Sequence, residues 1–203
     1  MEQNAALWLY FFLIRNIIIT MIKLSMMNLD KEPWYDNRPY MDIIDDLLNT
    51  SDVQRLDKIR HHYISTRLQH SLRVSYAAYL NALANNLDAK ACARGGLLHD
   101  LFFFLPKDVT FSRSVKFVHP RIALMNAKKL TELSAIEEDI IVHHMWLTGG
   151  STLFDMPHTK EGRLVSRIDK QVAQYEAKMM IKKKWNSRGY LPSLPNFAPV
   201  IMR

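Results

Sequence analysis

The stretch Gly95-Gly96-Leu97-Leu98-His99-Asp100 places a histidine and an aspartate side by side at the end of a segment rich in small residues. Ala89, Ala91 and Ala93 precede it, and this composition predicts a helix with room for a close helical neighbour. An ionised carboxylate in such an apolar run is costly unless it is paired or coordinates a cation. The stretch therefore predicts a pair of metal ligands inside a helical domain.

Apolar residues recur at helical spacing on both sides of this stretch, which predicts further amphipathic helices. Asp88 is a predicted N-cap, Ser134 and Glu137 form a predicted capping box, and His119-Pro120 is typical of a first helical turn. No alternating run is long enough for a strand, and no internal repeat is present. The predicted fold is all-α, with helices over residues 41–56 (two, broken at 49–52), 69–87, 119–130, 134–144 and 161–184.

The composition is that of a folded globular protein. Its 203 residues suit one domain, with 48% hydrophobic and 23% charged residues. The single cysteine, Cys92, cannot form an internal disulfide, which is compatible with the cytoplasm. The net charge of +7 is concentrated near residues 178–188, either as a solvated helix face or as a contact for phosphate-rich ligands. No aromatic-interleaved motif accompanies it, so we expect no sequence-specific nucleic-acid partner.

The chain divides into an apolar segment at residues 1–27, a domain at 28–185 and an irregular tail at 186–203. Residues 5–24 are as long as a membrane span, but Arg15 and Asn16 interrupt them at the centre. A signal peptide fits worse, because a basic start and a cleavage site are missing. Three interpretations stay open: a membrane or membrane-surface anchor, a start of translation at a later methionine, or an additional packed helix. Nothing in the sequence specifies an oligomeric state.

Five residues with metal-binding side chains follow one another at intervals of 20 to 29 positions: His70, His99, His119, His144 and Asp169. Each interval is about one helix plus a connection, so the side chains can return to one level of a helical bundle. Nitrogen and carboxylate ligands without thiolate suit Fe, Mn, Zn, Ni or Co rather than calcium. Asp100 is the natural bridge between two such ions.

This order resembles the HD superfamily of metal-dependent phosphohydrolases, whose signature H…HD…D expands to H…HD…H…H…D in its binuclear branch. The resemblance covers residues 55–180 and implies an all-α HD-domain bundle with the metal site in its core. Its catalytic pair would be His99 and Asp100. The implied metal ligands are His70, His99, Asp100, His119, Asp169 and either His144 or its neighbour His143.

The segments at residues 60–76, 96–104 and 142–146 also resemble a bacterial group of small stand-alone HD proteins. That group begins near the lead-in to the domain, which favours a late start, and keeps the histidine directly before Met145. His144 is therefore the first choice and His143 the reserve. The related HD-GYP phosphodiesterases carry a lysine and a glutamate where this chain has Phe103 and Thr66, so a trinuclear cyclic-dinucleotide enzyme is not expected.

The resemblance implies hydrolysis of a phosphate ester or anhydride of a nucleotide or similar small molecule. We expect two divalent cations, Fe or Mn ahead of Ni, Co or Zn, with Asp100 bridging them and orienting the attacking water. The alternatives are a di-iron oxygenase on the same ligands and a non-enzymatic module that senses nucleotides. His61 and His62 lie close enough to His70 in sequence to line the same pocket. The candidate side chains for binding phosphate charge are Arg73, Lys107, Arg121 and Lys170.

Overall fold

A computed structural model describes residues 34–61, 65–105, 108–111, 114–146, 148 and 155–186, without the side chains of 183–186. The predicted N-terminal segment 1–27 and the tail from residue 187 lie outside the described residues. Within the described part, no helix combines the length and the hydropathy that crossing a membrane requires.

Helices dominate the described chain, which confirms the all-α prediction. The exception is a two-residue antiparallel ladder, in which Arg60 pairs with Thr66 and His61 with Ser65. The sequence analysis predicted no strand at this place. The elements are η1 (Trp34–Asp36), α2 (Arg38–Leu48), α3 (Ser51–Arg55), η2 (Leu56–Lys58), β1 (Arg60–His61), β2 (Ser65–Thr66), α4 (Arg67–Ala84), α5 (Ala89–Leu98), α6 (Val115–Leu130), α7 (Ala135–His143) and α8 (Lys160–Asn186).

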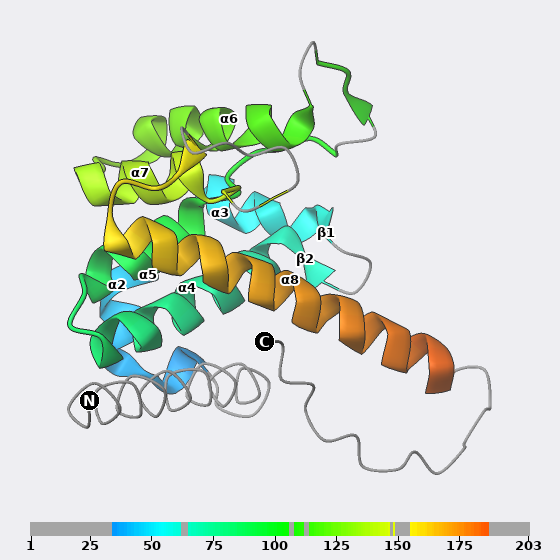
Figure 1. Ribbon diagram of the computed structural model, residues 1–203, viewed down its shortest axis with the longest axis horizontal. Helices are drawn as coiled ribbons and strands as arrows, with labels where there is room; N and C mark the ends of the chain where they lie inside the picture. The colour runs from blue at the N-terminus through cyan, green and yellow to red at the C-terminus, as the bar shows by residue number, and fades with distance from the viewer. Residues whose placement is uncertain are drawn as a thin grey trace, which may run out of the picture.

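The helices form a bundle of two groups, α4 with α5 and α6 with α7, and the long helix α8 packs against both groups (Figure 1). Helix α4 packs against α5, and α7 packs against α6 on one side and α5 on another. The long helix α8 crosses both α4 and α7, and α2 covers α5. This arrangement brings the carboxyl-terminal ends of α5 and α7 to the inner faces of α4, α6 and α8.

The predicted helix starts are confirmed at two positions and wrong at a third. Asp88 accepts from the amide of Ala91, and Ser134 and Glu137 form a complete capping box. Helix α6, however, begins at Val115, so Pro120 lies in its second turn and not at its start. Proline is tolerated in a first turn because its missing amide would have no partner there, whereas at this position it removes the donor to the Lys116 carbonyl, so Pro120 is a local cost within α6.

The two glycines before the His-Asp pair let three helices approach closely. A Cβ on Gly95 would lie 2.9 Å from Cγ2 of Ile140 on α7, and one on Gly96 would lie 3.0 Å from Cα of Ser75 on α4. Such contacts are tighter than the packing of protein interiors allows. The close helical approach that the small residues predicted is confirmed, and it places His99 and Asp100 between α4 and α7.

Candidate metal centre

Six of the predicted ligands lie together in the core of the bundle. His70 comes from α4, His99 and Asp100 from the turn after α5, and His119 from α6. The turn after α7 supplies His144, and α8 supplies Asp169. All six are buried. Ligand atoms lie within 4.8 Å of one another in two overlapping groups: His70, His99 and Asp169, and His99, Asp100 and His144.

Three of the histidines are held by the backbone of their own turns. Nδ1 lies 2.8 Å from the Gly96 carbonyl in His99, 2.9 Å from the Val115 carbonyl in His119 and 2.7 Å from the Ile141 carbonyl in His144. A carbonyl oxygen only accepts, so each Nδ1 carries the proton. Each ring then directs Nε2 into the centre, which is the arrangement that metal-binding histidines commonly show.

The facing atoms on the Asp100 side are two imidazole nitrogens and a carboxylate oxygen. Nε2 of His119 lies 2.9 Å from Nε2 of His144, and Oδ1 of Asp100 lies 3.3 Å and 3.5 Å from these two atoms. Oδ1 is fully buried, yet it accepts no well-aligned hydrogen bond from the described residues. A buried carboxylate oxygen without a hydrogen bond is costly, and a cation satisfies it. The donor set therefore fits a divalent transition metal.

His70 is positioned differently, between two carboxylates of α8. Its Nε2 lies 3.0 Å from Oδ1 of Asp169, and its Nδ1 lies 3.1 Å from Oε2 of Glu176, which is fully buried. Arg73 donates to the other Glu176 oxygen over 2.8 Å. Sequence analysis missed Glu176. Its spacing of seven residues from Asp169 places both carboxylates on one face of α8, and this signal could have found it.

Burial and charge move the pKa values of the histidines in opposite directions. Burial lowers the pKa of His70, but hydrogen bonds and charges from Asp169 and Glu176 outweigh it and raise the value to about 10. Burial and electrostatic interactions with His99 and His119 lower the pKa of His144 to about 3. Burial raises the pKa of Asp100, yet the surrounding imidazoles hold it well below its usual range. His144 is thus a neutral donor and Asp100 an ionised one.

Arg67 is a second residue that the sequence did not single out. It is 1% exposed, and its guanidinium donates to the carbonyls of Phe102 and Phe104 and stacks on the Phe102 ring. It therefore fixes the segment that follows Asp100. Among the predicted phosphate-binding cations, Arg121 bonds its own helix, and Lys170 donates to the His144 carbonyl over 2.7 Å. Lys107 lies outside the described residues.

The prediction ranked His144 ahead of the adjacent His143, and the structure places only His144 at the centre. His143 Nδ1 instead lies 2.8 Å from Oδ1 of Asp139, beside the ring of His158. Successive helical residues point about 100° apart, so only one of the pair can face inward. The inclusion of His143 among the ligands of this centre is therefore corrected.

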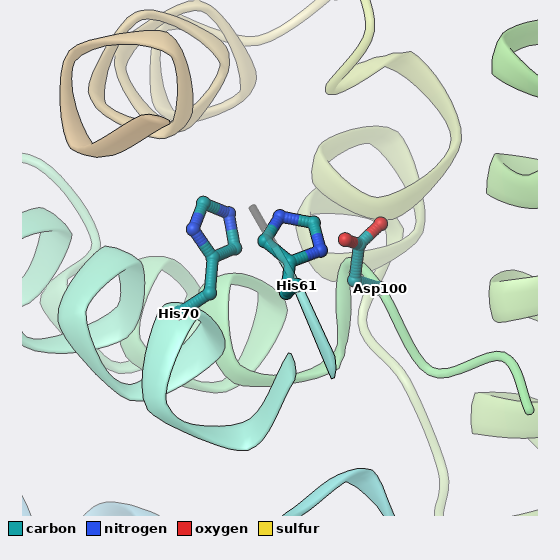
Figure 2. A group of neighbouring side chains, drawn as sticks. All are labelled: His61, His70 and Asp100. Carbon is teal, nitrogen blue, oxygen red and sulfur yellow. The ribbon is translucent and has the colours of Figure 1, made fainter. Parts of the chain in front are cut away.

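A further histidine approaches the centre from outside the bundle. His61 of β1, His70 and Asp100 have ligand atoms within 4.8 Å of one another, and Figure 2 shows the three side chains converging. The sequence had placed His61 and His62 near this pocket. The structure brings His61 to it, and His62 lies outside the described residues.

Comparison with known families gives one match. A family model described as HD domain matches residues 67–173, which is more than half of the chain and includes all six residues of the centre. No curated protein and no solved structure matches the chain.

Proposed function

The chain belongs to the HD domain family, and we propose that it is a metal-dependent phosphohydrolase that cleaves a phosphate ester or anhydride. The observation that carries the proposal is the convergence of six buried donors, with three imidazoles held so that Nε2 faces one ionised, incompletely bonded Asp100. Bound divalent cations would supply a nucleophilic water at neutral pH and offset phosphoryl charge.

The donors support two cation positions. His70, His99 and Asp169 form one group of ligand atoms, and Asp100 faces His119 and His144 on the other side. Because Asp100 lies between them, its two oxygens can serve both positions, so it is the proposed bridging residue. Iron and manganese are the proposed metals, ahead of nickel, cobalt and zinc, which imidazole and carboxylate donors without thiolate also suit.

Residues around the donors set their orientation. Glu176 accepts from Nδ1 of His70, and this contact turns Nε2 toward Asp169. Lys170 and Ser166 both donate to the His144 carbonyl and so hold the turn after α7 against α8. Asp100 is the proposed residue that orients the attacking water, because one of its oxygens retains an unused acceptor site.

The proposed substrate is a nucleotide or a similar small phosphate. Two cationic side chains near the centre support the proposal of an anionic ligand. Arg67 interacts electrostatically with Asp100, and Lys170 Nζ lies 3.9 Å from Asp169. Positively charged side chains near a site attract phosphate groups.

Metal content and phosphate release test the proposal together. Protein purified without chelator is analysed by mass spectrometry for bound metal and assayed on a panel of nucleotides. We expect about two equivalents of Fe or Mn and phosphate release from at least one nucleotide, with both lost in the His99→Ala/Asp100→Ala variant. The matched control is His158→Ala, an exposed histidine outside the centre. Wild-type protein that binds no metal after reconstitution, or binds it without releasing phosphate, contradicts the proposal.

A further inference from the structure

The β1–β2 ladder is anchored to the start of the helix that carries His70. Thr66 ends the ladder and is also the N-cap of α4, in a capping box with Gln69. Its hydroxyl donates to Asp57 over 2.7 Å, and the Arg67 amide donates to the Ile59 carbonyl over 2.8 Å. The start of α4 is therefore bonded to two residues that precede β1, which fixes the position of the ladder relative to α4.

The register of the ladder directs His61 inward. Residues directly opposite each other in an antiparallel pair project to the same face. His61 pairs with Ser65, which is 4% exposed, and Ser65 Oγ also donates to the His61 carbonyl over 3.2 Å. The other pair, Arg60 and Thr66, projects to the opposite face. The interior face of the ladder is thus the one that carries His61.

The His61 ring lies against the centre. Its centroid is 4.2 Å from that of His70, and its Nε2 is shielded from solvent. Figure 2 shows the ring between the His70 imidazole and the Asp100 carboxylate, with the three side chains coming from β1, α4 and the turn after α5. His61 is the only one of the three carried by the ladder and not by the bundle.

We propose that His61 is a further metal ligand, delivered to the His70–Asp100 side of the centre by the β1–β2 ladder. This inference rests on the proposed metal centre. Nδ1 of His70 is engaged by Glu176, so His70 has only Nε2 to offer a cation, and that atom already faces Asp169. His61 therefore completes the coordination of the common centre and does not form a separate site with His70. An imidazole donor suits the same metals as the other ligands.

Cobalt binding tests this proposal without an assay of activity. Metal-free wild-type protein, His61→Phe and the control His158→Phe are titrated with Co²⁺ and followed by visible spectroscopy. Phenylalanine keeps the ring contact with His70 but cannot coordinate. We expect His61→Phe to bind one equivalent about 10- to 100-fold more weakly, with an altered spectrum, which is at least the loss caused by removing an outer partner of a ligand. His158→Phe should match wild type.

Paramagnetic NMR of the Co²⁺-loaded protein gives a second readout. Each bound imidazole contributes a hyperfine-shifted N–H signal, and His61→Phe should lack one signal that His158→Phe retains. Unchanged affinity, spectrum and signal count in His61→Phe overturn the proposal. If His61→Phe unfolds at a lower temperature without metal, His61→Gln replaces it, with the same outcomes. Wild-type protein that binds no Co²⁺ contradicts the metal centre itself, whereas normal wild-type binding with an unaffected variant contradicts only the role of His61.

Discussion

Two adjacent histidines at the end of α7 enter two clusters that look alike by composition. His144 faces the buried centre, while His143 joins Asp139 and His158 in what we call the Asp139 cluster. Both clusters bring imidazole nitrogens and a carboxylate oxygen within 4.8 Å of one another. Proximity of donors alone therefore does not distinguish them.

The hydrogen bonds of the carboxylates do distinguish them. The Asp139 oxygens accept from the amides of His158 and Thr159 over 3.0 Å and 2.9 Å, from the Thr159 hydroxyl, and from His143. Both oxygens of Asp139 thus accept hydrogen bonds, and these bonds link α7 to the start of α8. A negative charge at this position also stabilises the N-terminus of α8. Oδ1 of Asp100 accepts no such bond within the described chain. The comparison therefore favours Asp100 over Asp139 as a metal ligand, because Asp100 leaves acceptor capacity unused.

The largest expected effect comes from Asp100→Asn. This change removes the bridging charge and should lower metal-dependent phosphate release by about 10³-fold, equivalent to several kcal/mol of transition-state stabilisation. Bound metal should fall with it, while the metal-free variant keeps the unfolding temperature of metal-free wild type within a few degrees. Activity and metal content at wild-type levels would show that Asp100 is no more a ligand than Asp139.

The reciprocal change, Asp139→Ala, should affect stability and not the metal. It leaves two backbone amides and a hydroxyl without their acceptor, so we expect a loss of about 2–4 kcal/mol in the free energy of unfolding. Urea denaturation measures this, and metal content of the folded protein should be unchanged. Asp42→Ala, which breaks the exposed Arg38–Asp42 pair, is the control and should cost less than about 1 kcal/mol. Loss of metal in Asp139→Ala at full folding would reverse the assignment of the two clusters.

Metal affinity should depend on pH through His70. Its pKa is raised to about 10 in the metal-free protein, so a cation must displace a proton, and affinity should rise by up to about tenfold per pH unit between pH 6.5 and 10. The same shift makes His70 stabilise the metal-free fold below about pH 6.5, and this stabilisation is lost as the pH rises through 10. Calorimetric titration at several pH values measures the slope. A flat profile in wild type would mean that His70 binds metal without losing a proton.

The smallest effect is expected for His158→Ala. The side chain is 77% exposed, and its Nδ1 lies 3.7 Å from Asp139, so its removal should change the free energy of unfolding by less than about 0.5 kcal/mol. Metal content should also stay constant. A lost equivalent of metal in this variant, measured by mass spectrometry, would make the Asp139 cluster a second metal site.

The sequence predicted the fold through local signals. Helical spacing, the Asp88 cap and the Ser134–Glu137 capping box depend on neighbouring residues, and the structure confirms the helices that they define. Pro120 misled the prediction of α6, because proline is typical of a first helical turn, whereas here it lies inside the helix. Local patterns therefore predicted which segments are helical better than they predicted the residues at which the helices begin.

The missed residues of the centre depend on partners distant in the chain. Glu176 lies in a lysine-rich helix, where a glutamate usually faces solvent, and only its contacts with His70 and Arg73 on α4 explain its burial. Arg67 is buried by the carbonyls after Asp100, which no local pattern reveals. The choice between His143 and His144 likewise required the direction of α7 relative to the bundle.

The contact between His70 and Glu176 also sets when the centre can assemble during synthesis. The two residues are 106 positions apart, and Asp169 follows His70 by 99. At ribosomal rates, roughly 5–20 s separate the emergence of the first ligand from that of its last partner. A nascent chain that ends before α8 presents His70, His99 and Asp100 without the carboxylates that complete their site. If the proposed centre binds its cations through these residues, capture is expected only after α8 has been synthesised.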